Sequence, residues 1–177
     1  MHNGYIKGKA AGRLCPDYVA SSIYDVELDK LRDSGISALI LDIDNTLAMP
    51  GAQKPDRGAI HWIDSAREAG FDICILSNAR RQRVASFASG FGIYAIAGAG
   101  KPARTGFVKA LRLLNRTAEQ VCVIGDQIFT DVYGARRLGI LAIYTKPITK
   151  REVISILLKR IAEAAVLKYY RASAPDS

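Results

Sequence analysis

The chain has 177 residues and a formal net charge of +8, and 49% of its residues are hydrophobic while 24% are charged. This length is typical of one domain, and the composition excludes disordered, collagen-like and low-complexity classes. Apolar stretches end well before the about 18 residues that a membrane-spanning helix needs, and the N-terminus lacks the apolar core of a secretory signal. Cys15, Cys74 and Cys122 have no metal-ligand spacing, so we expect buried free thiols and a cytoplasmic domain over residues 1–177.

The positive charge is concentrated in one part of the sequence. Residues 73–118 contain eight basic and no acidic residues, whereas residues 1–72 carry a net charge of −3. A positive field favours an anionic partner, which can be a phosphate ester, a nucleic acid or an acidic membrane surface. Charge alone does not distinguish among these three classes.

Apolar runs alternate with helical patterns along the chain. Strands are predicted over residues 38–43, 71–76, 93–96, 121–124 and 140–144. Helices are predicted over residues 57–69, 81–88, 102–114, 132–138 and 150–171. Residues 10–35 are predicted to be a turn and a short helix that lead into a core spanning about 36–148. This alternation predicts an α/β fold, a three-layer doubly wound parallel sheet with helices on both faces.

Polar residues lie at the carboxyl ends of three of the predicted strands. Asp42 and Asp44 lie at the carboxyl end of the first, Ser77 and Asn78 follow the second, and Asp126 lies just after the fourth. The carboxyl ends of parallel strands lie at one edge of a sheet, so these residues are expected to meet in one crevice. Two aspartates spaced two apart on an extended segment point the same way. Their repulsion is relieved when a hard cation such as Mg2+ lies between them or when one is protonated.

Two further residues are candidates for the same crevice. Lys101 precedes a predicted helix, where its ammonium can neutralise both a phosphoryl group and a carboxylate, although a solvated surface lysine is the alternative. Asp131 opens the next helix and either completes an acidic pocket or only caps that helix. Ser77 can hold a phosphoryl oxygen or be an ordinary turn residue.

Four segments together resemble the motifs of the haloacid dehalogenase-like (HAD) phosphatase superfamily. They are DIDNTL at 42–47, SN at 77–78, KP at 101–102 and GDQIFTD at 125–131. The flanking segments, CPDYV at 15–19 and KPI at 146–148 among them, are similar to subfamily IIIA, the YqeG-type branch, which includes phosphatidylglycerophosphatase. The resemblance implies a Rossmann-like core and a phosphomonoesterase that forms an aspartyl-phosphate.

The resemblance also implies a role for each motif residue. Asp42 would be the nucleophile and Asp44 the general acid and base, while Ser77 and Lys101 would bind the phosphoryl oxygens. The implied metal is Mg2+, with Mn2+ as a possible substitute. Its implied ligands are Asp42, the backbone carbonyl of Asp44 and Asp126, while Asp131 would lie in the same pocket, either as a further ligand or next to the ligands. The residues assigned to substrate binding are Thr46, which would brace the loop after the nucleophile, and Asn78, Arg80 and Arg81, with Arg83 and Arg104 near the mouth of the crevice.

The spacing between motifs bears on the substrate. Asp44 and Ser77 are separated by 32 residues, and Ser77 and Lys101 by 23, which leaves no room for an inserted cap domain. An uncapped crevice suits a large substrate or one embedded in a surface. The basic amphipathic helix over 150–171 either lies on an anionic membrane or packs on the sheet as an ordinary last helix.

Three functions follow from these observations. The first is dephosphorylation of phosphatidylglycerophosphate to phosphatidylglycerol, by a cytoplasmic enzyme bound peripherally to the inner membrane face. The second is a phosphatase for a soluble or nucleic-acid phosphate ester, although basic segments interleaved with stacking aromatics are missing and a nucleic-acid partner is not expected. The third is a non-enzymatic phospho-acceptor or binding module, against which the presence of both Asp42 and Asp44 argues.

Overall fold

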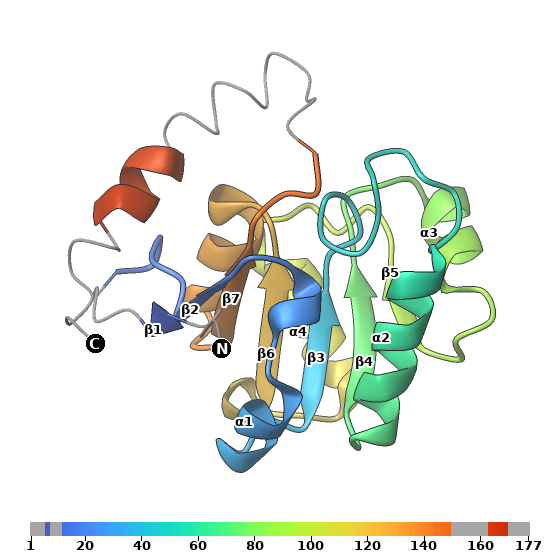
Figure 1. The fold of residues 1–177 in the computed structure, drawn as a ribbon, viewed down its shortest axis with the longest axis horizontal. Helices are drawn as coiled ribbons and strands as arrows, with labels where there is room; N and C mark the ends of the chain where they lie inside the picture. Colours follow the sequence, from blue (N-terminus) through green and yellow to red (C-terminus); the bar gives the residue numbers. More distant parts are fainter. Residues whose placement is uncertain (1–5, 8–11, 150–162, 170–177) are drawn as a thin grey trace.

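A computed structural model describes residues 6–7, 12–149 and 163–169 of the chain. Within these residues a seven-stranded sheet forms the middle layer, in the order β1-β2-β7-β6-β3-β4-β5 (Figure 1). The strands are β1 (Ile6–Lys7), β2 (Tyr18–Ala20), β3 (Ala38–Leu41), β4 (Asp72–Leu76), β5 (Tyr94–Ile96), β6 (Val121–Gly125) and β7 (Leu141–Thr145). All neighbouring strands are parallel except β1, which runs antiparallel to β2. The expected doubly wound α/β fold is confirmed.

Helices cover both faces of this sheet. One apolar core contains residues of α1 (Leu28–Asp33), α2 (Arg57–Glu68) and α3 (Arg81–Ala88). The core on the other face contains residues of α4 (Arg104–Leu114) and α5 (Tyr133–Arg136). Short 3-10 turns occupy Ile23–Asp25 and Ala118–Gln120, and one π-helical turn occupies Ile128–Val132.

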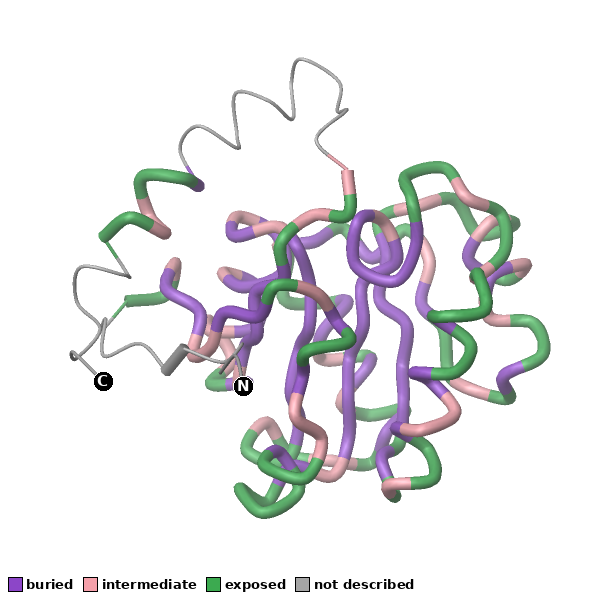
Figure 2. The backbone as a smooth tube through the Cα atoms, viewed as in Figure 1, coloured by how far each residue is buried: buried purple, intermediate pink, exposed green. Residues whose placement is uncertain are grey.

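The strands at the centre of the sheet are buried on both faces (Figure 2). In β3, Leu39 and Leu41 belong to one core and Ala38 and Ile40 to the other, as the two-residue period of a strand requires. Each fully buried Leu or Ile side chain contributes about 1.5–3 kcal/mol relative to an exposed one. This burial makes the sheet a rigid base for the loops that follow each strand.

The N-terminal lead-in differs from the prediction. Instead of only a turn and a helix, it contains β2, which pairs in parallel with β7 and places Tyr18 opposite Ile143. Asp17 fixes this pairing, because its carboxylate accepts hydrogen bonds from the backbone N–H of Ala142 (2.8 Å) and from the guanidinium of Arg136 (2.6 Å). Three residues are too few to show a strand period, so contacts distant in sequence decide their conformation.

Two helices also begin elsewhere than predicted. The helix predicted from residue 102 begins at Arg104, since Pro102 lies in the turn before it. The helix predicted over 132–138 is observed as the shorter α5 over Tyr133–Arg136, and the π turn over Ile128–Val132 precedes it. Of the basic helix predicted over 150–171, residues 163–169 are helical, and the remainder lies outside the described residues. In the described parts of the chain, none of the helices is long and apolar enough to span a membrane.

The order of the strands creates a topological switch point at the centre of the sheet. The chain moves from β3 outward to β4 and β5, then returns to the other side of β3 with β6 and β7. The loops after β3 and β6 therefore diverge at the switch point, where open parallel sheets bind ligands. Between residues 12 and 149 no inserted domain interrupts the fold. Only α2 and β4 separate Asp44 from Ser77, and only α3 and β5 separate Ser77 from Lys101.

Candidate active site

The loop after β3 carries Asp42 into the crevice. The side chain is buried, and its backbone N–H donates to the carbonyl of Ile124 in β6 (3.1 Å), which extends the pairing of the two strands by one residue. Asn45 then turns the chain with a φ of +60°, a left-handed conformation that asparagine tolerates better than most residues. The chain thus turns directly after the two aspartates.

Asn45 also fastens this loop to the segment after β7. Its backbone carbonyl accepts from Ile148 (3.2 Å) and its side-chain oxygen from Thr149 (3.1 Å). Thr46, expected to brace the loop, is buried and packed, but its Oγ1 has no hydrogen-bond partner within the described residues. Sequence reasoning missed the role of Asn45, although the preference of asparagine for left-handed turns was a usable signal.

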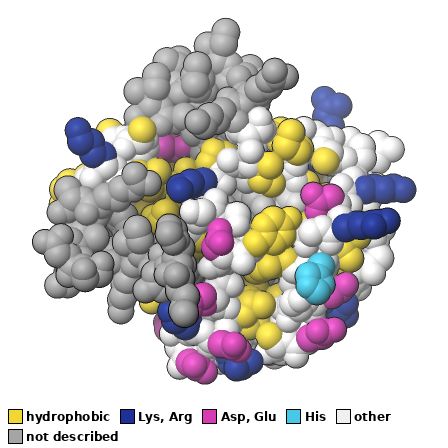
Figure 3. Space-filling view, in the orientation of Figure 1, with side chains coloured by type: hydrophobic (Ala, Val, Ile, Leu, Met, Phe, Trp, Pro, Cys, Tyr) yellow, Lys and Arg dark blue, Asp and Glu magenta, His cyan; other side chains and the backbone are white. Residues whose placement is uncertain are grey.

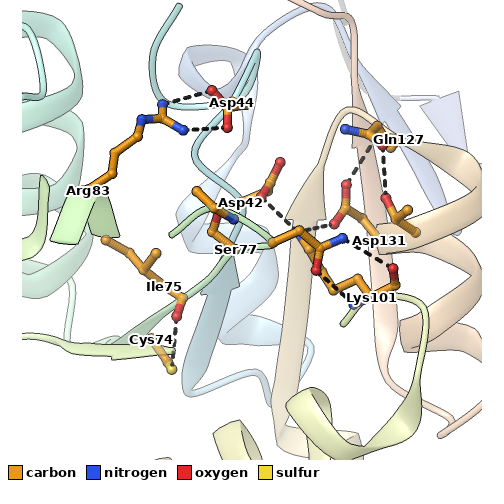
Figure 4. Close-up of polar contacts among 12 residues, drawn as sticks. Asp42, Asp44, Cys74, Ile75, Ser77, Arg83, Lys101, Gln127 and Asp131 are labelled. Atoms are coloured by element: carbon orange, nitrogen blue, oxygen red, sulfur yellow. Dashed lines mark hydrogen bonds and ion pairs between the residues drawn. The ribbon is translucent and has the colours of Figure 1, made fainter. Parts of the chain in front are cut away.

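Lys101 lies between two of the predicted acidic residues (Figure 4). Its Nζ donates to Asp42 (2.7 Å) and to Asp131 (2.6 Å), and all three side chains are buried. Burial would lower the pKa of Lys101, but the carboxylates of Asp131 and Asp42 raise it above its usual value, so the ammonium stays charged. The solvated surface position considered for Lys101 is therefore wrong.

Asn78 holds the backbone of Lys101 in place. Its side-chain oxygen accepts from the Lys101 N–H (2.8 Å), and its side-chain amide donates to the Lys101 carbonyl (3.1 Å). The adjacent Ser77 is buried, and its Oγ accepts from the N–H of Ala79 (3.1 Å). Since β4 neighbours β3, this segment lies beside the loop that carries Asp42. The contacts found for Asn78 are those of a positioning group, and its expected binding of substrate stays a prediction.

Three buried aspartates gather around this lysine. Each of Asp42, Asp126 and Asp131 offers an oxygen within 4.8 Å of the others. Burial raises the pKa of Asp42 to about 6, with Lys101 opposing the shift and Asp131 adding to it. Asp131 lies inside the π turn rather than at a helix N-cap, and its second oxygen accepts from the Gln127 N–H (3.2 Å), so capping alone does not explain it.

These residues fit a divalent cation. Three buried carboxylates with oxygens within 4.8 Å of one another repel each other, and such a group is costly unless cations lie among them. Carboxylate oxygens are the ligands that Mg2+ and Mn2+ prefer. The chemistry of Asp42, Asp126 and Asp131 thus fits a divalent metal, and the carboxylate of Asp44 is not part of that cluster.

We expect Mg2+ to bind here more weakly as the solution becomes acidic. The pKa of Asp42 is about 6, so below that pH a proton competes with the cation for this carboxylate. The dissociation constant should therefore rise toward about tenfold for each pH unit below 6 and change little above 7. Calorimetric titration with Mg2+ at pH 5 and pH 8 measures this. Equal affinity at both pH values would contradict the assignment of Asp42 as a ligand.

Gly125 makes room for Asp131 at the end of β6. A Cβ atom at this position would lie 2.5 Å from Cγ of Asp131, closer than real contacts allow. Gly125→Ala should displace Asp131 from Lys101, and a shift of about 1 Å in such a site can reduce turnover about a hundredfold. Mg2+ affinity and turnover measure the effect. Gly35→Ala strains the backbone at a φ of +86° without a steric clash, so it controls for a general loss of stability, and equal turnover in the two variants would refute the prediction.

Asp44 has a different partner from the cluster. Its two carboxylate oxygens accept from the guanidinium of Arg83 at 2.6 and 2.7 Å, and one also accepts from the N–H of Gly51 (3.1 Å). Sequence reasoning placed Arg83 only near the mouth of the crevice. It missed this pair because the two residues are 39 positions apart and carry no local pattern.

The other arginines expected at the mouth are exposed. Arg80 immediately precedes α3, and Arg81 begins it. Arg81 and Lys109 line a cavity of about 440 Å³ beside β5. Arg104 begins α4. On the face seen in Figure 3, Lys and Arg side chains gather toward the right edge and several acidic ones along the lower edge. Basic and acidic side chains are therefore unevenly distributed over this face, as they are along the sequence.

A residue from the C-terminal segment reaches the acidic loop. Glu163 is buried, and its carboxylate accepts from the backbone N–H of Ile128, which follows Asp126 by two residues (2.8 Å). Sequence analysis gave no signal for this contact, since the predicted helix offered only its basic face. The three cysteines are buried and free, as expected, and burial raises the pKa of Cys74 to about 12.

Comparison with known proteins identifies the family. The sequence profile of the haloacid dehalogenase-like hydrolases matches residues 8–139. The probable phosphatase YqeG of Bacillus subtilis is 31% identical over 152 residues, which cover 86% of this chain and 88% of that protein. The chain therefore belongs to the haloacid dehalogenase-like hydrolases. It is a phosphatase, as its sequence motifs predicted.

Two more distant relatives add detail. The chloroplastic phosphatidylglycerophosphate phosphatase 1 of Chlamydomonas reinhardtii is 25% identical over 143 residues, covering 76% of this chain but 53% of that protein. The chain thus spans about half the length of that relative. The cobalt-bound deoxy-D-mannose-octulosonate 8-phosphate phosphatase of Haemophilus influenzae superimposes with a TM-score of 0.51 at 16% identity, over 81% of this chain and 93% of that one. This likeness shows the fold.

Proposed function

We propose that the chain hydrolyses phosphomonoesters through a phosphorylated Asp42. The observation that carries the proposal is the buried group of three carboxylates and one ammonium at the switch point of the sheet. A carboxylate oxygen of Asp42 forms a bond to phosphorus, and the bond from phosphorus to the leaving oxygen breaks. Lys101 and Ser77 bind the phosphoryl oxygens, and Lys101 keeps Asp42 oriented. Mg2+, held by Asp42, Asp126 and Asp131, would supply charge neutralisation.

Asp44 supplies and removes the protons in this mechanism. It donates a proton to the leaving oxygen in the first step. In the second step it accepts a proton from water, whose oxygen attacks the phosphorus of the acyl phosphate, and the bond to Asp42 breaks. Inorganic phosphate and the free Asp42 carboxylate result. The backbone carbonyl of Asp44 is proposed as a further metal ligand, as the family resemblance implies.

The substrate proposed here is phosphatidylglycerophosphate, which would be converted to phosphatidylglycerol. Three observations support it: the likeness to the algal enzyme, the fold without a cap, and the acid-free segment 73–118 near the crevice. A crevice without a cap admits a phosphate group whose lipid remains in a bilayer. Arg80, Arg81 and the basic residues of 150–171 would attract anionic lipid at the inner face of a membrane.

Phosphate release from phosphatidylglycerophosphate in mixed micelles tests the substrate. We expect release that requires Mg2+ and exceeds that from a soluble alkyl phosphate of matched concentration by at least about tenfold in kcat/KM. Comparable rates on both would favour a soluble ester as the physiological substrate. Hydrolysis of an aryl phosphate without any release from the lipid would support phosphomonoester hydrolysis but exclude phosphatidylglycerophosphate as the substrate.

A further inference from the structure

All three nitrogens of the Arg83 guanidinium donate hydrogen bonds to the loop after β3. Arg83 lies in the first turn of α3, and its side chain is 14% exposed. Two of its nitrogens donate to the two oxygens of Asp44, and Nε donates to the carbonyl of Ala52 (2.9 Å). One side chain thus joins α3 to two points of the loop between β3 and α2.

Asp44 depends on this partner for its orientation. Its carboxylate is 30% exposed and accepts three hydrogen bonds, two of them from Arg83 and one from Gly51. The remaining bond joins one oxygen to a turn exposed to solvent, so it does not fix the plane of the carboxylate. In Figure 4, Arg83 approaches Asp44 on one side, while Asp42 lies on the other.

A parallel two-point contact is what arginine provides and lysine does not. The planar fork of the guanidinium matches both oxygens of a carboxylate, which fixes the direction of the group as well as its distance. Removal of the fork is therefore expected to change the direction of the Asp44 carboxylate.

We propose that Arg83 is a positioning residue, which holds the Asp44 carboxylate where the leaving oxygen of the substrate needs its proton. The inference rests on the acid and base role proposed for Asp44. Arg83 does not touch the phosphoryl group in this account. It acts through Asp44. The hydrogen bond to the carbonyl of Ala52 keeps the guanidinium in place, so that Asp44 and Arg83 do not shift together.

The dependence of the rate on the leaving group tests this role. An alkyl alkoxide needs protonation to leave, whereas 4-nitrophenolate leaves without it. In kcat/KM, which includes only steps through phosphorylation of Asp42, Arg83→Met should lower the rate on glycerol phosphate by about a hundredfold or more. On 4-nitrophenyl phosphate the same variant should lose less than about tenfold. Arg83→Lys should resemble Arg83→Met, since it keeps the charge and loses the fork.

Two controls separate positioning from a general effect. Arg67→Met removes another ion-paired arginine, exposed on α2 at 4.0 Å from Asp64, and should leave both rates unchanged. In an Asp44→Asn background, Arg83→Met should cause no further loss on the alkyl substrate, because both changes remove the same contribution. Thermal unfolding of each variant verifies the fold.

The outcomes distinguish this inference from the proposed function. Equal losses on both substrates, or no loss on glycerol phosphate, would overturn the role of Arg83 while leaving the phosphatase intact. A wild-type chain that hydrolyses neither substrate in a manner sensitive to Asp42→Asn would instead refute the proposed function itself.

Discussion

Asp42→Asn is expected to reduce phosphatase turnover by at least about a thousandfold. The amide keeps the size of the side chain and can still accept a hydrogen bond from Lys101, but it cannot form the acyl phosphate. The steady-state rate of phosphate release in saturating Mg2+ measures the loss. Asp64→Asn, an exposed aspartate on α2, is the matched control and should retain full activity.

The stability of this variant should not fall. Burial makes the ionised form of Asp42 unfavourable, and its neighbour Asp131 adds repulsion, so a neutral amide relieves both effects. We expect metal-free Asp42→Asn to unfold at the same temperature as the wild type or a higher one. Inactivity together with a marked drop in unfolding temperature would indicate damage to the fold, and retained turnover would exclude Asp42 as the nucleophile.

Lys101→Met is expected to cost about 3–5 kcal/mol of unfolding free energy in the absence of metal. The ammonium is the cation seen between Asp42 and Asp131, and its removal leaves buried carboxylates facing one another. Mg2+ should restore part of this stability. Turnover should remain at least about a hundredfold below the wild type, since a group that stabilises the phosphoryl oxygens is lost. Urea unfolding with and without Mg2+ measures the first effect.

The loss of stability in Lys101→Met should also depend on pH. The pKa of Asp42 in the folded protein, about 6, exceeds its ordinary value of 3.8, so the folded state binds this proton more tightly than the unfolded state. Stability from the protonated carboxyl is therefore present below pH 4 and lost as the pH rises through 6. The variant should be closer to the wild type at pH 5 than at pH 8. Lys109→Met, on the exposed face of α4, should show neither effect.

The layered sheet could be predicted because its strands are strongly apolar. β3 and β6 are buried along their whole length, so their sequences are continuous apolar runs that end at polar residues. The polar residue after each run then lies at the sheet edge by geometry alone. This reasoning predicted that Asp42 and Asp126 lie close together. The order of the motifs then predicted that Lys101 lies in the same place.

Contacts between distant segments could not be predicted in this way. β2 is held by its pairing with β7 and by Asp17, and the three residues of the strand carry no sequence pattern that indicates either contact. The arginines at 80–83 predict a positive surface, but the sequence does not indicate which of them faces Asp44. Glu163 and Ile128 are 35 positions apart, and only folding brings them together. Such side-chain pairings are set by tertiary packing rather than by local pattern.

Detection of the phosphorylated intermediate is the decisive test of Asp42 as the nucleophile. The enzyme is mixed with a slight excess of an alkyl phosphate and Mg2+, quenched in acid within one turnover, digested and analysed by mass spectrometry. We expect a phosphorylated peptide in which the modified residue is Asp42, formed before phosphate is released and missing in Asp42→Asn. Release of phosphate in the first turnover without a phosphorylated peptide, or phosphate carried on another residue, would contradict this assignment.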